Sequence, residues 1–303
     1  MGVSMAIIQP LFDKMIDVSF YLESGTLSVF DSIFTPITGR KPQIKLSGTL
    51  YARNAIADMQ LTLVNFYTTT PLSNYQSMSI KAGYKNSVSA TFEAQIFASY
   101  VDKPPPDSET VFITKVGQYD SFINQTFNKN YSKNSTTVDT ILKDIALQMG
   151  LYNKKLVTVN YQPVTFSQFG STQIPCDFNF PGSSICDCLS KISTAYKDRI
   201  VIRPEGSNLN VYSKGIGTGT IYQIDYITSA RNDCGTFTIV APWNPKIRPG
   251  DIVQANPAYF TQYQGGQFIG TNLFQVYTVN FEFDTCEESN QMTLVCIPSK
   301  GGL

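Results

Sequence analysis

The sequence predicts a mainly β protein of the α+β class, in which two antiparallel β units flank a small α/β insertion. Two patterns predict this. Apolar and polar residues alternate with a period of two from about residue 43 to 116 and again after residue 220, as in half-buried strands. Between these regions, two segments carry apolar residues at helical spacing, each followed by strand-like residues. We therefore divide the 303 residues into 1–130, 131–215 and 216–303.

Five strands are expected in the first unit, because each shows the alternation and is bounded by turn-forming residues. They lie around residues 44–50, 59–63, 78–82, 90–96 and 110–116. The breaks between them are 68–74, 83–89 and 101–108, the last with three consecutive prolines. Short strands separated by turns favour a sandwich or a small barrel over a βαβ fold.

The apolar N-terminal segment, residues 1–40, is expected to add a strand and a helix to this unit, with contact to a neighbouring chain as the alternative. It is not typical of a signal peptide, because it lacks a basic start and is interrupted by Pro10, Asp13 and Lys14. A run of about 18 apolar residues, as a spanning helix needs, does not occur in the sequence. We expect no membrane anchoring.

An Asn-rich loop is expected before the insertion. It holds three glycosylation triplets, at Asn124, Asn130 and Asn134, which such a composition produces by chance. Thr136 and Asp139 then have the spacing of a capping box, and the helix that follows is expected to end at Gly150 in the C′ position. A strand around residues 155–161 completes the first helix-strand unit.

The second helix-strand unit repeats this order. Ser183 or Ser184 caps a helix whose apolar stripe comprises Ile185, Cys188, Leu189, Ile192 and Tyr196. Strands at 199–203 and 208–212 follow, joined by a turn at 204–207. The stripe places Cys188 in the core as a small hydrophobic residue.

Three glycines, Gly215, Gly217 and Gly219, mark the boundary to the last unit. A dinucleotide-binding loop would need a helix after the third glycine, whereas residues 220–224 resemble a strand, so we interpret the glycines as a linker. The last unit returns to alternation. Its expected strands contain residues 237–239, 252–253, 274–283 and 292–296.

The composition excludes several functions. The chain has no histidine, which removes Ser/His/Asp triads, Cys/His dyads, zinc sites that use histidine and imidazole switches. The 23 basic and 23 acidic residues balance, so no net positive field exists to attract nucleic acid. We expect no catalytic residue, no cofactor and no metal, and a protein that is not an enzyme.

The six cysteines are too sparse for a disulfide scaffold, so we expect free and mostly buried thiols. The closest pair, Cys186 and Cys188, lacks the second tight pair of ligands that a tetrahedral zinc site needs.

Four stretches carry a resemblance to a known family. They are IKLSGTLYARNAIADMQLTLVNF at 44–66, MSIKAGY at 78–84, YKDRIVIRPEGSNLNVYSKG at 197–216, and NPKIRPGDIVQA at 244–255 with the strands at 274–285 and 291–299. In this order and spacing the chain resembles the baseplate hub proteins of contractile-tailed bacteriophages, which are related to the hub part of type VI secretion spike proteins. It departs from them at Glu282, Asp284 and Glu287, where a basic residue or histidine is expected.

The resemblance implies two tail-tube-like antiparallel β-barrels with a small α/β insertion between them. It implies a homotrimer with pseudo-sixfold symmetry that joins the hexameric tail tube to the trimeric central spike and lines the DNA channel. The implied partners are the tail tube protein or a tube initiator, the spike, the tape measure protein, and DNA that passes without specific binding. The implied location is the virion, in the tail baseplate, after assembly in the host cytoplasm.

Other functions remain open at this point. The same architecture suits a distal tail or tube-initiator protein. The many tyrosines and Trp243 suit a carbohydrate-binding β-sandwich adhesin. The acidic residues Glu282, Asp284, Glu287 and Glu288 are the candidates for a glycosidase, whose chemistry needs two carboxylates and no histidine.

Overall fold

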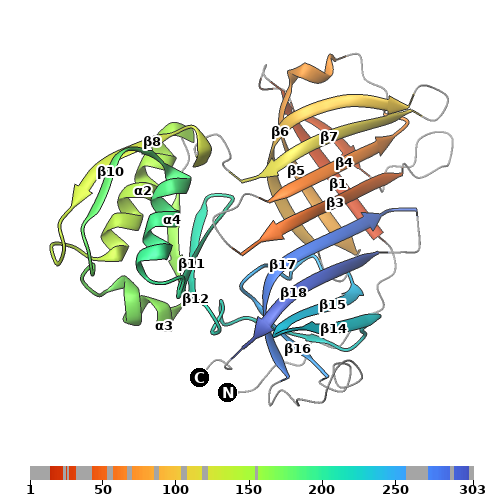
Figure 1. The fold of residues 1–303 in the computed structure, drawn as a ribbon. Coiled ribbons are helices and arrows are strands. Elements are labelled where there is room, and N and C mark those ends of the chain that lie inside the picture. Colours follow the sequence, from red (N-terminus) through yellow and green to blue (C-terminus); the bar gives the residue numbers. More distant parts are fainter. Residues whose placement is uncertain are drawn as a thin grey trace.

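The computed structural model describes residues 14–22, 25, 27–31, 43–52, 57–66, 70–84, 89–103, 108–117, 122–153, 156–256, 272–286 and 290–299. Two bodies are visible in Figure 1: a large curled sheet, here called the β body, and a smaller lobe with helices, here called the insertion. The mainly β class is confirmed.

In the described residues the β body is a 13-stranded sheet, almost entirely antiparallel. Its strands are β1 (Lys14–Leu22), β2 (Leu27–Asp31), β3 (Ile44–Tyr51), β4 (Asp58–Val64), β5 (Tyr75–Tyr84), β6 (Ser89–Lys103), β7 (Glu109–Val116), β13 (Ile221–Ile224), β14 (Ser229–Asp233), β15 (Thr236–Pro242), β16 (Ile252–Ala255), β17 (Leu273–Asp284) and β18 (Gln291–Pro298). A short 3₁₀ helix, η1 (Leu72–Asn74), precedes β5. Within the described sheet only β13 and β16 pair in parallel.

The two β units meet at one seam. β3 from the first unit pairs antiparallel with β17 from the second, from Tyr51 opposite Thr278 to Lys45 opposite Asp284. The strand order β14-β15-β18-β17-β3-β4-β7-β6-β5-β1-β2 therefore runs through both units without a break. Apolar side chains of both units also belong to one hydrophobic cluster. The alternation seen in the sequence fills this shared core, with Ile44, Leu46 and Leu50 buried on β3.

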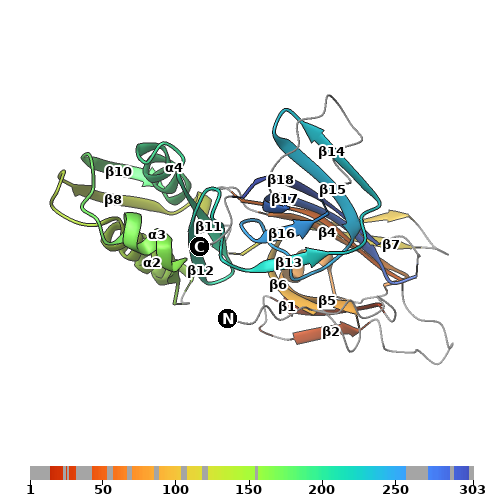
Figure 2. The same cartoon turned by 90° about the horizontal axis from the view of Figure 1, so that it is seen from below.

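The insertion has its own core, separate from that of the β body. Its elements are β8 (Thr126–Tyr131), α2 (Val138–Asn153), β9 (Thr158–Tyr161), α3 (Pro163–Thr165), the π-helical turn η2 (Phe166–Gly170), β10 (Phe178–Ser184), α4 (Ile185–Ala195), β11 (Ile200–Glu205) and β12 (Asn208–Ser213). β8 pairs with β10, and β11, β12 and β9 form a three-stranded sheet. In Figures 1 and 2, the hairpin of β11 and β12 lies between the two helices and the β body.

The two long helices test the capping predictions. Ser184 caps α4 by accepting a hydrogen bond from the backbone N–H of Asp187 at 3.1 Å, as expected. The prediction for α2 is wrong by one residue, because Thr137 rather than Thr136 accepts from the third helical N–H, that of Thr140. Asp139 instead forms an ion pair with Lys143 one turn later at 2.7 Å. The helix also continues past Gly150 to Asn153, since a glycine permits a helix end without requiring one.

The segment expected to be an Asn-rich loop is partly a strand. β8 covers six of its residues and pairs with β10, which the sequence also did not reveal. Asn124, Asn130 and Asn134 are all exposed. The alternation is hard to see here because only Phe127 is buried on β8.

The N-terminal segment contributes two strands to the first β unit. β1 pairs with β5 and with β2, so the expected strand of residues 1–40 is confirmed. In the described part of this segment, 14–22, 25 and 27–31, no residue is helical. The remainder, 1–13, 23–24, 26 and 32–40, lies outside the described residues.

Candidate assembly surfaces and the junction with the insertion

The β11–β12 hairpin is buried on both faces. Ile200, Ile202 and Leu209 point into the core of the insertion. The alternate residues Val201 and Tyr212 face the β body, where they pack with Ala52 and Tyr277. Successive side chains of a strand point to opposite faces, so this hairpin connects the two bodies.

An ionic cluster occupies the same junction. Glu205 at the end of β11 accepts from Arg248 Nε at 2.9 Å on one oxygen and from Arg203 Nη2 on the other. Arg203, which is 6% exposed, also donates to the backbone carbonyl of Pro249. The Arg248 guanidinium lies 4.5 Å from the ring centroid of Phe92 on β6. The cluster therefore joins the insertion to both β units of the β body.

The pKa of Glu205 reflects this environment. Burial raises it, but the Arg203 and Arg248 guanidinium groups more than offset burial, so the pKa lies below its ordinary value. Charge-assisted hydrogen bonds of this kind are stronger than neutral ones. Glu205 is thus held as a carboxylate at neutral pH.

Asp251 fixes the turn that carries Arg248. It accepts from Thr218 Oγ1 at 2.6 Å and from the backbone N–H of Arg248 at 2.8 Å. Burial raises the pKa of Asp251, and these hydrogen bonds offset only part of the rise. The glycine-containing linker before β13 is therefore tied to the turn at 245–251, and it leads into a strand rather than a helix, as the sequence predicted.

The sheet has open edges within the described residues. Its strand order ends at β14 on one side and at β2 on the other, and β13 pairs only with β16. β6 extends to Lys103, beyond the break expected from residue 101, and exposes Phe97 (66%) and Val101 (54%) near its end. Unpaired backbone groups and exposed apolar side chains are features of surfaces that contact other chains.

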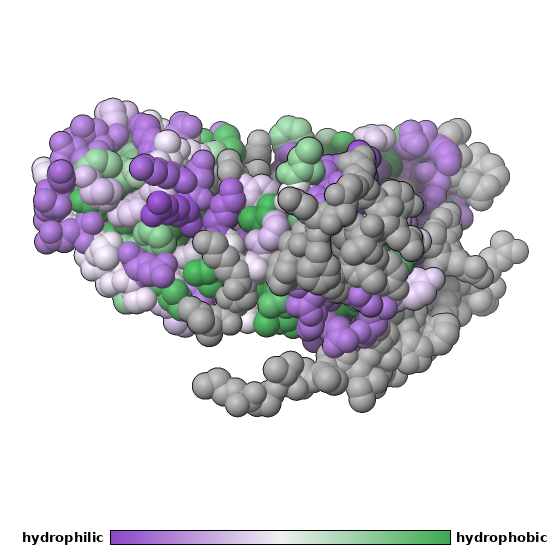
Figure 3. All heavy atoms as spheres, turned by 60° about the horizontal axis from the view of Figure 1, so that its bottom comes forward, coloured by the Kyte–Doolittle hydropathy of each residue, from purple (hydrophilic) through white to green (hydrophobic). Residues whose placement is uncertain are grey.

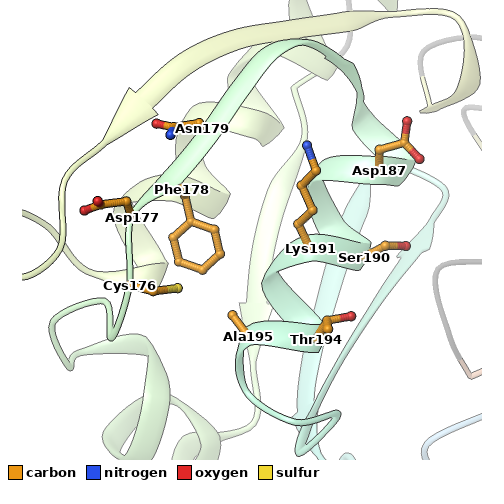
Figure 4. Close-up of a pocket in the computed structure, with 9 residues that line it drawn as sticks. All are labelled: Cys176, Asp177, Phe178, Asn179, Asp187, Ser190, Lys191, Thr194 and Ala195. Atoms are coloured by element: carbon orange, nitrogen blue, oxygen red, sulfur yellow. The ribbon is translucent and has the colours of Figure 1, made fainter.

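A groove of about 620 Å³ lies between β10 and α4 of the insertion. Figure 4 shows Phe178 and Cys176 on one side and Ala195 and Thr194 on the other. Lys191 of α4 donates to Ser183 Oγ at 3.2 Å. On the face drawn in Figure 3, hydrophilic residues predominate over the insertion and hydrophobic residues form small separate areas.

The structure shows where most of the residues considered for sugar binding or catalysis lie. Trp243 is 1% exposed and stacks on Phe281 with centroids 5.0 Å apart, so it cannot stack on a sugar ring in this conformation. Asp284 is buried and accepts from Gln43 Nε2 and from the backbone N–H of Cys286. Glu282 is exposed on β17. Glu287 and Glu288 lie outside the described residues.

The cysteines are free, as expected, but the prediction that most are buried is wrong. Cys188 and Cys296 are buried, whereas Cys176, Cys234 and Cys286 are exposed because they lie in connecting segments.

Among the described residues, no three histidine, cysteine, aspartate or glutamate side chains are grouped to hold a metal ion. None of the described helices is both long enough and apolar enough to cross a membrane.

No family model and no curated protein matches the chain, but solved structures do. An E. coli component of the type VI secretion system, described as similar to the T4 bacteriophage tail proteins gp27 and gp5, matches with a TM-score of 0.61 and 11% identity over 88% of this chain and 76% of that one. A tail protein from Neisseria meningitidis matches with a TM-score of 0.60 and 10% identity, over 94% of this chain and 97% of that one. The tail protein of prophage MuSo2 from Shewanella oneidensis matches with a TM-score of 0.58 and 7% identity, over 94% of this chain and 97% of that one.

The chain has the fold of these tail proteins. The resemblance drawn from the four sequence stretches is confirmed at the level of the fold. The junction cluster was not foreseen, although Arg248 and Asp251 belong to one of the stretches and Arg203 and Glu205 to another. A signal was present, since charged residues stand on the second face of an otherwise apolar strand at 200–205.

Proposed function

We propose that this protein is a structural baseplate hub of a contractile phage tail. The observation that carries the proposal is the seam between β3 and β17, which holds two β units in one continuous sheet within one chain. Three such chains would present six β units around a common axis. A homotrimer would then match a hexameric tail tube on one side and a trimeric central spike on the other.

The open edges of the sheet support assembly into a ring. Among the strands that the structure describes, β14 and β2 end the order on opposite sides, so each chain offers two edges to its neighbours. Cyclic homo-oligomers use such unlike surfaces in closed head-to-tail contacts. In this arrangement the protein lines the DNA channel, contacts the tube or tube initiator, the spike and the tape measure protein, and carries no catalytic step.

The composition supports a passive channel wall. The chain has zero formal net charge and only 15% charged residues, so DNA would not be attracted strongly to it. We keep three proposed units, but because Phe122 and β8 pack in the insertion we place the first boundary before residue 122 instead of at 130, with the second at 215/216. The proposed location is the virion, after assembly in the host cytoplasm.

Mass and symmetry test the proposal. Native mass spectrometry and light scattering of the purified chain should give three times the 33.6 kDa of one chain, and class averages of the particles should show six similar lobes around the axis. Binding to the tube and spike proteins of the same particle should require the trimer. A monomer at high concentration that binds neither protein would contradict the proposal, and density at another level of the tail would favour a distal tail role.

A further inference from the structure

The apolar contact between the insertion and the β body consists of few residues. Each body has a hydrophobic core of its own, and the apolar cluster between them contains three buried residues, Ala52, Val201 and Tyr212, with Tyr277 beside them. Apolar burial alone therefore orders each body internally and contributes little to their relative orientation.

Hydrogen bonds from the Tyr212 hydroxyl to the carbonyl of Ala52 and from the Gly215 N–H to Gln275 also cross the junction. The charged cluster adds a contact between oppositely charged groups. Glu205 belongs to the insertion, Arg248 to the turn before β16, and Phe92, which Arg248 covers, to the first β unit. Both oxygens of Glu205 are used by guanidinium groups from the two bodies. Two directional contacts to planar groups fix an angle as well as a distance.

We propose that Glu205 is the positioning residue that sets the orientation of the insertion on the β body. The pair is partly buried, and removing the Glu205 carboxylate leaves two guanidinium charges facing each other without compensation, which weakens the contact. Without the Glu205 carboxylate, Arg203 and Arg248 repel each other at the junction, while neither hydrophobic core loses a residue. The insertion would then stay folded and sample a range of orientations. This orientation is a property of the single chain and does not depend on the proposed trimer.

The protein carries a suitable pair of labelling sites. Cys176 is an exposed thiol on the insertion, and Cys234 is an exposed thiol in the turn between β14 and β15 of the β body. With Cys186→Ala and Cys286→Ser, spin labels at these two positions report the distance between the bodies. Dilution with unlabelled protein removes distances between chains.

The experiment measures the distance between the two spin labels by pulsed electron–electron double resonance. It compares the labelled protein with its Glu205→Gln variant and with a Glu282→Gln control. Glu282 is exposed on β17, where it lies opposite Ser47 and Gln291 and not opposite a residue of the junction. The original protein and the control should give the same narrow distance distribution. Glu205→Gln should broaden it, with faster hydrogen exchange in β11 and β12 and unchanged protection in α2 and α4. A distribution as narrow as the original would overturn the proposal.

A second variant covers the case in which Glu205→Gln does not fold. Arg248→Lys keeps the positive charge and loses the planar donor group that reaches Glu205 and covers Phe92. It should broaden the distance distribution beyond that of the Glu282→Gln control. An unchanged distribution in Arg248→Lys would also overturn the assignment.

Discussion

The ring of Tyr212 lies directly against Gly250, at the point where the insertion meets the turn before β16. A Cβ atom on residue 250 would lie 2.4 Å from Cζ of this ring, and the backbone of Gly250 has φ +99°. The hydroxyl of Tyr212 donates to the carbonyl oxygen of Ala52 at 3.2 Å, which fixes the ring in place. A glycine is required here for two independent reasons.

Gly250→Ala should therefore destabilise the protein by about 3 kcal/mol or more, from backbone strain and overpacking together. Gly235 is the matched control, because it has a similar φ of +91° and no atom lies within 4 Å of the place that a Cβ would take. Gly235→Ala should cost only the backbone strain, about 1 kcal/mol. Urea unfolding followed by circular dichroism measures both. Equal losses in the two variants would show that the Tyr212 contact carries no energy.

Trp243 is the only tryptophan, so its fluorescence reports one site. Its ring lies 4.5 Å from that of Phe283 and 5.0 Å from that of Phe281, measured between centroids. Trp243→Ala should cost about 3–5 kcal/mol, as for other buried aromatic residues. In the unchanged protein, acrylamide should quench the emission weakly until the sheet unfolds. Strong quenching in the native state, or quenching relieved by an added glycan, would contradict the buried position.

The cysteine thiols should fall into two groups that differ in how fast they react with a maleimide. Cys176, Cys234 and Cys286 are exposed and should react rapidly with a maleimide. Burial raises the pKa of Cys188 to about 11 and that of Cys296 further still, and only the thiolate reacts. These two should react only on unfolding. Mass spectrometry of the labelled peptides checks the order, and early labelling of Cys296 would be inconsistent with the fold.

The stability contributed by Glu205 should depend on pH. Its folded-state pKa is depressed below the ordinary 4.5, so the contribution is present in full above 4.5 and is lost as the pH falls through the lower folded value. The stability difference between the original protein and Glu205→Gln should thus be largest near neutral pH and shrink in acid. Denaturant unfolding at several pH values measures it. A difference that stays constant with pH would mean that the carboxylate charge is not what matters.

Much of the fold could be predicted from the sequence because the spacing of apolar residues along the chain indicates many of its strands and helices. β3, β4, β7 and α4 begin and end within a residue or two of their expected positions. The pairing of β8 with β10 could not be predicted, since Phe127 alone marks the buried face of β8 and its partner follows only after α2, β9 and α3.

The junction could not be predicted for a different reason. Arg203 and Glu205 look like the solvated face of a hairpin, and only the tertiary contact with Arg248 and Phe92 buries that face. The exposure of Cys176 and Cys234 could not be predicted either, because it depends on which connecting segments the folded bodies leave uncovered.

The seam between the two β units also bears on how the chain is made. β3 ends at Tyr51, whereas its partner β17 begins only at Leu273, so the whole insertion lies between the two strands in the chain. One edge of β3 therefore has no partner strand while the segment between β3 and β17 is being synthesised, and the insertion, whose contacts are more local, can fold in that interval. An edge strand left open for that long is a site for wrong pairing between nascent chains. The yield of correctly folded protein should thus depend on how soon the last strands arrive.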